Sequence, residues 1–247
     1  MQPGKICRRC FVSLAALGAL GLGAQVSAEG PSVFKAVNAP REAIDHLRIF
    51  SPVGIQAFAV APNGGWALVS RDGRVAMEGT PPGFGEQLRA CVQRGHRIHS
   101  FAFTNAGGWT LFTDQGYHNS DVGVPQACVR RQNELAAAGG KLLAVTYGQG
   151  DHWVVTSDRG GVYTSVDGPD FRDRILSFTQ PGPIRVVALS PQGGASALFD
   201  GRRYDTKNLP RECVKAVEEA TVAGYGIDGL SLLPNDGWII ITSRPRQ

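Results

Sequence analysis

The four tryptophans of the chain stand in one column of an internal repeat. When the sequence is aligned on an apolar residue that recurs every 42 to 44 positions, each tryptophan lies eleven residues after that anchor. The anchors are Ile55, Ile98, Leu142, Ile184 and Ile227, and the column holds Trp66, Trp109, Trp153, Ala195 and Trp238. Self-similarity at a period of roughly 40–45 residues is typical of folds that repeat one small structural unit. The column therefore predicts five copies of a single unit.

Each unit begins with strand patterns and ends with a helix pattern. An alternating strand such as IQAFAVA is followed by a glycine turn, a second strand such as GWALVS, and a turn that contains an aspartate. After a third strand a proline opens a segment whose apolar residues recur every three or four positions, interrupted once by Gln132. The aspartates are Asp72, Asp114, Asp158 and Asp200, and the prolines are Pro40, Pro82, Pro125, Pro169 and Pro210.

The two ends of the chain complement each other. The last unit stops after its second strand, whereas residues 32–50 supply a strand and a helix with no strand pair before them. We expect residues 32–50 to complete the last unit, which closes a ring and hides edges that would promote aggregation. The predicted fold is mainly β with one short helix per repeat: a single domain, residues 29–247, forming a five-bladed β-propeller closed by its N- and C-terminal segments.

These repeats resemble five-bladed β-propellers, of which the tachylectin type is the best known. They also resemble the penteins, whose five-fold units contain two strands, a helix and a strand, so a pentein-like α/β propeller is the alternative. The resemblance covers the chain after its leader and depends on repeat count, length and strand–turn pattern, without a motif specific to one family. A pentein-type enzyme would use a cysteine and a histidine near the axis, whereas Cys91, Cys128 and Cys213 fall in the predicted outer helices.

Residues 1–28 have the order of a secretory signal peptide. Lys5, Arg8 and Arg9 precede an apolar run, and small residues follow it at 26–28. The stretch RRCFV resembles the twin-arginine export signal, although Cys7 replaces the usual Ser or Thr and leaves Sec export open. The sequence predicts a periplasmic or extracellular protein without stable membrane insertion, because the run is too short and too rich in glycine to span a bilayer.

Charge and cysteine content exclude several classes of function. Three of the 25 basic residues lie in the leader, so 22 Lys and Arg face 21 Asp and Glu in the remainder. This balance lacks the basic footprint of a nucleic-acid-binding protein. Of the five cysteines, the three that follow the leader give no disulfide framework, although a bridge between Cys91 and Cys128 is possible in an oxidising compartment. No motif predicts a metal or a cofactor.

The residue directly after each anchor varies while the scaffold stays regular. This position holds Gln56, His99, Leu143, Arg185 and Asp228. The first strand of each repeat should line the axis, so these side chains should meet at one mouth of a central channel. There Gln56, His99, Arg185 and Asp228 could bind an anionic ligand or perform acid–base chemistry. A weaker candidate is the pair Asp151–His152, which replaces two glycines in a turn at the opposite mouth.

The tryptophan column allows two interpretations. Trp66, Trp109, Trp153 and Trp238 either pack between neighbouring blades or form aromatic platforms for saccharides. Together these observations predict an exported, non-enzymatic propeller that recognises a protein or a saccharide. The alternative is an enzyme with an acid–base site at the channel mouth.

Overall fold

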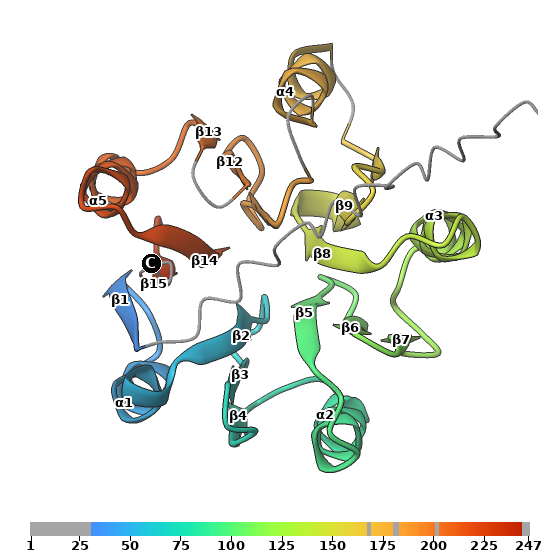
Figure 1. Cartoon of the computed structure of the whole chain (residues 1–247), viewed down its shortest axis with the longest axis horizontal. Coiled ribbons are helices and arrows are strands. Elements are labelled where there is room, and N and C mark those ends of the chain that lie inside the picture. The colour runs from blue at the N-terminus through green and yellow to red at the C-terminus, as the bar shows by residue number, and fades with distance from the viewer. Residues whose placement is uncertain (1–30, 167–168, 180–182, 201–202, 244–247) are drawn as a thin grey trace, which may run out of the picture.

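A computed structural model describes residues 31–166, 169–179, 183–200 and 203–243 of the chain. The predicted signal peptide at residues 1–28 lies outside the described residues. Within them, each repeat forms one three-stranded antiparallel sheet. Figure 1 shows these sheets arranged around a common centre with the helices on the outside, which is the arrangement of a β-propeller.

The five sheets are numbered here in chain order of their inner strands. Sheet 1 consists of β2 (Ile55–Val60), β3 (Trp66–Ser70) and β4 (Val75–Glu78); sheet 2 of β5 (Ile98–Phe103), β6 (Trp109–Thr113) and β7 (Gly116–Asn119); sheet 3 of β8 (Leu142–Tyr147), β9 (Trp153–Ser157) and β10 (Val162–Thr164); sheet 4 of β11 (Val186–Leu189), β12 (Ser196–Phe199) and β13 (Tyr204–Lys207); sheet 5 of β14 (Gly226–Leu232), β15 (Trp238–Ser243) and β1 (Ser32–Val37). Consecutive inner strands contact one another, and β14 also contacts β2.

Sheet 5 is assembled from both ends of the described chain. Strand β1 pairs antiparallel with β15, from Ser32 opposite Ser243 to Val37 opposite Trp238. The backbone N–H of Ile55 also donates to the Ser32 hydroxyl over 2.9 Å, which links β1 to the start of sheet 1. Residues 32–37 therefore supply the third strand that the C-terminal repeat lacks.

One helix follows the outer strand of each sheet. These are α1 (Arg41–Phe50), α2 (Phe84–Gln93), α3 (Gln126–Ala137), α4 (Pro169–Thr179) and α5 (Arg211–Val222). Proline was expected at the first helical position, but only α4 begins with one. Pro40, Pro125 and Pro210 are the N-caps of their helices, with ψ between 127° and 137°. An N-cap residue has extended rather than helical ψ, which proline adopts readily. In α2 the cap is Gly83, after Pro82.

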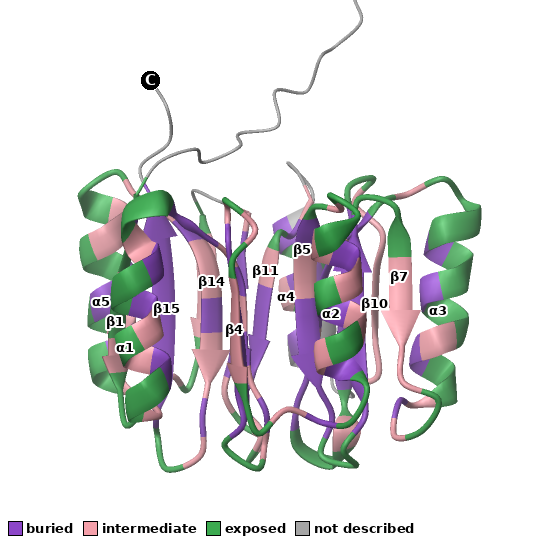
Figure 2. Cartoon of the chain, turned by 90° about the horizontal axis from the view of Figure 1, so that it is seen from below, coloured by how far each residue is buried: buried purple, intermediate pink, exposed green. Residues whose placement is uncertain are grey.

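The hydrophobic core is divided into five clusters, one between each pair of neighbouring sheets. The cluster between sheets 1 and 2 joins Ala67 of β3, Leu88 of α2 and Phe101 of β5, and the other four follow the same plan. Figure 2 shows the buried residues concentrated on inner and middle strands and on the inward faces of the helices. Each helix thus covers the outer side of one seam, as the one-faced apolar pattern predicts.

The tryptophan column lies inside these clusters. The four rings are between 3% and 6% exposed, and each belongs to the seam that its sheet shares with the preceding sheet. Trp109 packs edge-on to Phe84 with ring centroids 5.7 Å apart, and its indole N–H donates to the carbonyl of Pro82 over 3.0 Å. The rings fill the gaps between sheets and expose no open face for a saccharide.

The two glycines that precede the tryptophans have different roles. Gly64 has a φ of +87°, which favours glycine, as expected for a tight turn. Gly65 does not have a positive φ. A Cβ on Gly65 would lie 2.0 Å from the carbonyl oxygen of Gly79, so the second glycine is required because another backbone segment crosses there. The turn therefore requires its two glycines for different reasons.

Gln132, which interrupts the apolar face of α3, belongs to a buried polar network. Its amide accepts from Asn119 Nδ2 over 2.8 Å and donates to Cys128 Sγ over 3.3 Å. Thr110 bonds both Asn119 and the Tyr147 hydroxyl, which lies 3.6 Å from Cys128 Sγ. Every member has a partner, so the network satisfies polar groups buried between sheets 2 and 3.

The three cysteines in the described residues are free and buried. Cys91, Cys128 and Cys213 lie on α2, α3 and α5, so the bridge considered between Cys91 and Cys128 is not formed. Burial raises the pKa of Cys128 to about 11 and that of Cys213 to about 12. These two thiols are therefore protonated at neutral pH and poor nucleophiles.

Candidate functional site

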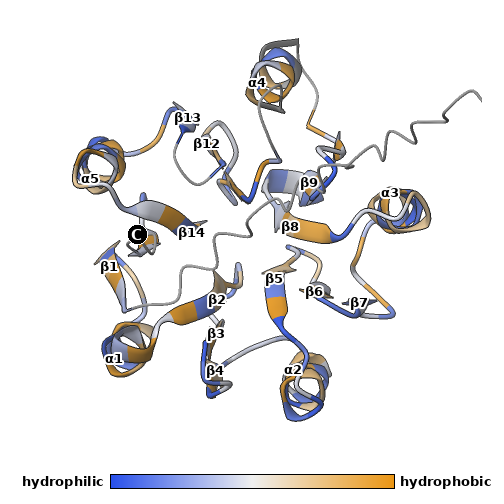
Figure 3. Cartoon of the chain, in the orientation of Figure 1, coloured by the Kyte–Doolittle hydropathy of each residue, from blue (hydrophilic) through white to orange (hydrophobic). Residues whose placement is uncertain are grey.

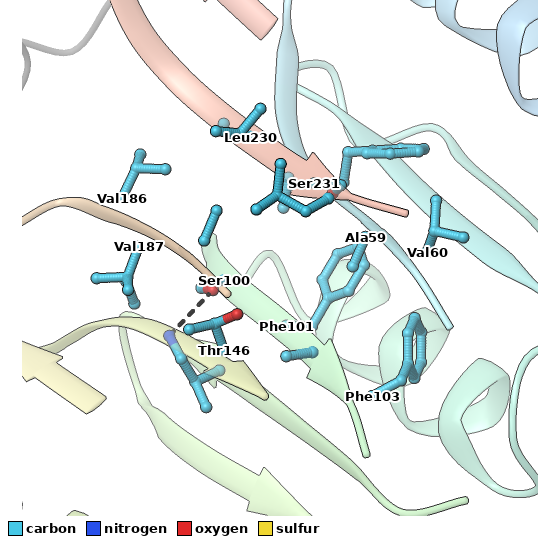
Figure 4. A pocket seen from close by; sticks show the side chains of 18 of the residues that line it. Ala59, Val60, Ser100, Phe101, Phe103, Thr146, Val186, Val187, Leu230 and Ser231 are labelled. Carbon is cyan, nitrogen blue, oxygen red and sulfur yellow. Dashed lines mark hydrogen bonds between the residues drawn. The ribbon is translucent and has the colours of Figure 1, made fainter. Parts of the chain in front are cut away.

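A narrow channel runs along the centre of the sheets. Its cavity has a volume of about 110 Å³ and is lined by residues of all five inner strands. Figure 4 shows side chains from different sheets converging on it, among them Ala59, Ser100, Thr146 and Ser231. Ser100 accepts the backbone N–H of Val145 over 3.4 Å and so joins two neighbouring inner strands across the channel wall. The hydropathy colouring of Figure 3 shows apolar stretches on the inner strands where they approach the centre.

The four polar residues predicted from the sequence all line this cavity. Gln56, His99, Arg185 and Asp228 lie at the start of the inner strands of sheets 1, 2, 4 and 5. We call this end of the cavity the bulged mouth; Leu143, at the same position in sheet 3, is not among the lining residues. The repeat thus brings together at one opening four residues that are far apart in the sequence.

A β-bulge occurs at this position in four of the five sheets. The strand registers shift between Ile55 and Ala57, between Ile98 and Ser100, between Leu142 and Ala144, and between Ile227 and Gly229. Gln56, His99, Leu143 and Asp228 are therefore the extra residues. In sheet 4, Arg185 directly precedes β11, and its backbone N–H donates to the Phe199 carbonyl over 2.8 Å. A bulge bends its strand and re-aims a side chain, so the scaffold presents one variable residue per sheet here.

Asp228 is already engaged by a residue that the sequence did not single out. Its Oδ2 lies 3.4 Å from Nη2 of Arg71, which also reaches the Ser243 hydroxyl over 3.5 Å. Burial raises the pKa of Asp228, while the hydrogen bond with Ser243 and the charge of Arg71 act in the opposite direction. This ion pair joins sheets 5 and 1, so we assign Asp228 to the seam rather than to a ligand.

The repeat register contained a signal for this pair. Counting sixteen residues from each anchor gives Arg71, Asp114, Asp158 and Asp200 in the first four repeats. Asp72, which was grouped with the hairpin aspartates, is one position out of register. Arg71 stands where three other repeats have aspartate. Its partner, Asp228, is the bulge residue of the neighbouring sheet 5.

Two of the hairpin aspartates accept the backbone N–H of the residue that precedes an inner strand. Asp114 Oδ1 accepts the N–H of Arg97 over 3.0 Å, and Asp158 Oδ1 accepts the N–H of Lys141 over 2.8 Å. They fix the residue that precedes each inner strand. Among the described residues, no group of three or more His, Cys, Asp or Glu side chains is arranged to hold a metal ion.

His99 and Arg185 differ from Asp228 because they have unused hydrogen-bonding capacity. His99 Nε2 is buried and has no hydrogen-bond partner within the described part of the chain. Burial, and then the charge of Arg97, lowers the pKa of His99 from its ordinary value of 6.5, with Lys141 acting in the same direction and Asp114 and Asp158 opposing. His99 is therefore neutral at pH 7, and Arg185 is exposed at the rim.

The second sequence candidate, Asp151–His152, stabilises a turn at the opposite mouth. Asp151 has a φ of +58°, and its Oδ1 accepts the N–H of Asn105 from the neighbouring sheet over 2.6 Å. His152 Nδ1 lies 2.9 Å from the carbonyl oxygen of Ser165. Both side chains are occupied by backbone groups, and neither lines the cavity.

Comparison with known proteins gives only distant similarity. No protein-family model matches the chain, and no curated protein matches it. Among solved structures it is similar to YCF48 bound to D1 peptide, at 13% identity over 79% of this chain and 52% of that one, with a TM-score of 0.36. It is also similar to the β-propeller domain of Myceliophteria thermophila Cps50 (Swd1), at 11% identity, 65% and 55% coverage and a TM-score of 0.35. The chain spans about half the length of these two structures.

A third similar structure is an enzyme, virginiamycin B lyase from Staphylococcus aureus. The identity is 9%, the coverage is 78% of this chain and 66% of that one, and the TM-score is 0.22. In the chain itself, no helix within the described ranges is long and apolar enough to cross a membrane.

Proposed function

We propose that this protein is a five-bladed β-propeller, exported from the cytoplasm, that binds a protein partner at its bulged mouth without catalysing a reaction. The observation that carries the proposal is that the mouth residues share one cavity but are not hydrogen-bonded to one another. Gln56, His99, Arg185 and Asp228 line one cavity, yet no hydrogen bond joins any two of them among the described residues. Acid–base catalysis needs a proton donor and acceptor oriented toward a shared reacting atom, whereas recognition needs side chains held at fixed positions around an opening.

The five-bladed, closed architecture is supported by strand pairing and inner-strand contacts. β1 pairs with β15, Arg71 of sheet 1 pairs with Asp228 of sheet 5, and the contacts of the inner strands return from β14 to β2. A chain that starts at residue 39 lacks β1 and leaves the edge of β15 unpaired. We expect this chain to lose cooperative urea unfolding and to associate. A control chain starting at residue 31 should unfold as the longer protein does, and equal behaviour of the two would contradict closure by β1.

Export rests on the order of residues at 1–28 alone. A protease-protection assay on cells that express residues 1–247 tests it. The chain should be found in the periplasmic or extracellular fraction. If the twin-arginine route is used, replacement of Arg8 and Arg9 by lysine should retain it in the cytoplasm. Cytoplasmic retention of the unaltered chain would contradict export.

A protein is the better-supported partner than a saccharide. The four indole rings that could stack on sugars are buried between sheets. The bulged mouth is a small opening on a rigid scaffold, and rigid scaffolds that present variable residues suit protein recognition. A glycan array probed with residues 29–247 should show no specific binding, and a reproducible glycan signal would favour the saccharide alternative.

Affinity capture from periplasmic extract tests the proposal directly. Residues 29–247 are immobilised as three versions: unaltered, a mouth variant with Gln56→Ala and Arg185→Ala, and a control with Arg211→Ala on α5 and Gln192→Ala at the opposite mouth. We expect a protein that the unaltered and control versions retain and the mouth variant loses. That protein is then purified, and its affinity for all three versions is measured by calorimetry. Equal affinities would refute binding at the bulged mouth.

A further inference from the structure

We propose that the bulged mouth recognises a carboxylate group on the protein partner, an acidic side chain or a chain end, with Arg185 as its charged anchor and His99 and Gln56 as further donors. This inference rests on the proposed function, because it names the chemistry that the partner presents to the same site. It follows from which hydrogen-bonding groups around the opening are used within the protein and which are not.

The carboxylates at and behind the mouth are occupied. Asp228 is held by Arg71 and Ser243. Asp114 and Asp158, on the turns behind the mouth, accept backbone N–H groups, and Asp200 accepts the side chain of Arg203. A partner that offered cationic or N–H donors would therefore find each of these carboxylates already engaged.

The donors around the mouth remain available. In the described residues, the guanidinium of Arg185 has no ion pair or hydrogen bond, and the amide of Gln56 has none either. His99 also lines the cavity, and its Nε2 is buried and unpartnered. Arginine carries five donors and no acceptor, and its planar fork matches the two oxygens of a carboxylate. A ligand that satisfies the Arg185 guanidinium must supply acceptor oxygens, and the Gln56 amide can donate to the same group.

The size of the channel limits what can enter. A cavity of about 110 Å³ is smaller than the roughly 300–1,000 Å³ typical of small-molecule pockets. Its walls are lined by small side chains such as Ala57 and Ala59, which bring the strands close together. A carboxylate at the tip of a side chain or at a chain end fits such an opening, while the body of the partner stays outside against the exposed Arg185.

His99 couples recognition to proton uptake. In the free protein its pKa is lowered by burial and by Arg97 and Lys141, and the carboxylates of Asp114 and Asp158 only partly compensate. A carboxylate in the mouth adds one more negative charge near the ring and favours the imidazolium. Binding should therefore strengthen as pH falls below neutrality, over the range in which the bound protein holds a proton that the free protein lacks.

Nuclear magnetic resonance titration of residues 29–247 with defined peptides tests this inference. The first probe, acetyl-Gly-Glu-Gly-amide, carries its carboxylate on a side chain, and the second, acetyl-Gly-Gln-Gly with a free end, carries it at the chain terminus. Acetyl-Gly-Gln-Gly-amide is the neutral control. At constant ionic strength we expect at least one carboxylate peptide to shift the His99 ring and Arg185 Nε resonances with saturation, and the neutral peptide to shift neither. The stronger carboxylate peptide identifies which source the site prefers.

Two variants separate the proposed roles. Arg185→Gln should weaken carboxylate binding about tenfold or more, whereas Arg211→Gln, an exposed arginine on α5, should leave it unchanged. His99→Gln should remove most of the gain in affinity between about pH 7.5 and about pH 5.5 while changing the affinity at about pH 7.5 less than threefold. Equal responses to charged and neutral peptides, or unchanged binding in Arg185→Gln, would overturn the inference.

The outcome is separable from that of the proposed function. If a captured partner depends on the mouth but binds equally to Arg185→Gln, carboxylate recognition is wrong and the binding function stands. If the carboxylate peptides bind through Arg185 but no protein is captured through the mouth, carboxylate recognition stands and the proposed partner class is wrong.

Discussion

Removing one indole from the tryptophan column should destabilise the protein by several kilocalories per mole. Trp109 is 6% exposed and belongs to the cluster between sheets 1 and 2, against Phe84 of α2. Replacement of a buried tryptophan by alanine costs about 3–5 kcal/mol. The variant also loses the hydrogen bond from the indole N–H to the Pro82 carbonyl, worth about 0.5–1.5 kcal/mol. Because Pro82 is exposed, water can donate to its carbonyl and limits the cost of the lost hydrogen bond. The free energy of unfolding of Trp109→Ala should therefore fall by about 4–5 kcal/mol.

Urea unfolding followed by far-ultraviolet circular dichroism measures this loss. With a slope of roughly 2–3 kcal/mol per molar urea, the midpoint should fall by about 1.3–2.5 M. Trp109→Phe keeps an apolar ring but loses the N–H, so we expect it to lose less than half as much. Val122→Ala, at a residue that is 75% exposed, should change the stability by less than about 0.5 kcal/mol. A loss below about 1 kcal/mol in Trp109→Ala would refute the packing of this ring between sheets.

Three further predictions concern local features of the fold. Gly65→Ala should destabilise the protein toward urea more than Gly64→Ala, because a Cβ at Gly65 would lie 2.0 Å from a carbonyl oxygen. At Gly64 the only obstacle to alanine is the φ of +87°, which costs about 1 kcal/mol. The thiols of Cys128 and Cys213 should not react with Ellman's reagent in native residues 29–247 and should react in urea; rapid native reaction would contradict their burial. The urea midpoint should fall as pH decreases below about 6.5, since the unfolded chain then binds a proton that folded His99 does not, and His99→Gln should reduce this fall.

The alignment of the repeats predicted most of the architecture, because the side chains that pack the sheets recur with the period of the structural unit. Packing between sheets was one of two interpretations of the column of Trp66, Trp109, Trp153 and Trp238, and these rings lie in four different seam clusters. The incomplete last repeat predicted that residues 32–50 would supply its missing strand, and β1 pairs with β15 along six residues. In both cases a local pattern and its spatial partner repeat together, so one sequence contains several independent copies of the signal.

The features that the sequence did not yield are those that occur once or that depend on backbone detail. A β-bulge has no composition of its own, so the sequence singled out Gln56 and His99 as variable polar positions but did not show that they are extra residues in their strands. The pair of Arg71 and Asp228 joins residues 157 positions apart in different sheets, and the repeat register marks Arg71 as an exception without showing which residue it contacts. Gln132 looked like a break in the apolar face of α3 because its partners come from other elements.

Polar contacts that occur at only one seam can determine the order in which the similar sheets pack. Five similar sheets with similar apolar faces could pack in a wrong order, because hydrophobic contact does not distinguish one seam from another. The polar contacts do distinguish them: Arg71 with Asp228 between sheets 5 and 1, Thr110 with Tyr147 between sheets 2 and 3, and Thr156 with the carbonyl of Ile184 between sheets 3 and 4. A misplaced sheet would bury at least one of these groups without a partner, at about 1–3 kcal/mol each. The seam contacts therefore favour one order of the sheets, and that order determines which of Gln56, His99 and Arg185 are neighbours around the mouth.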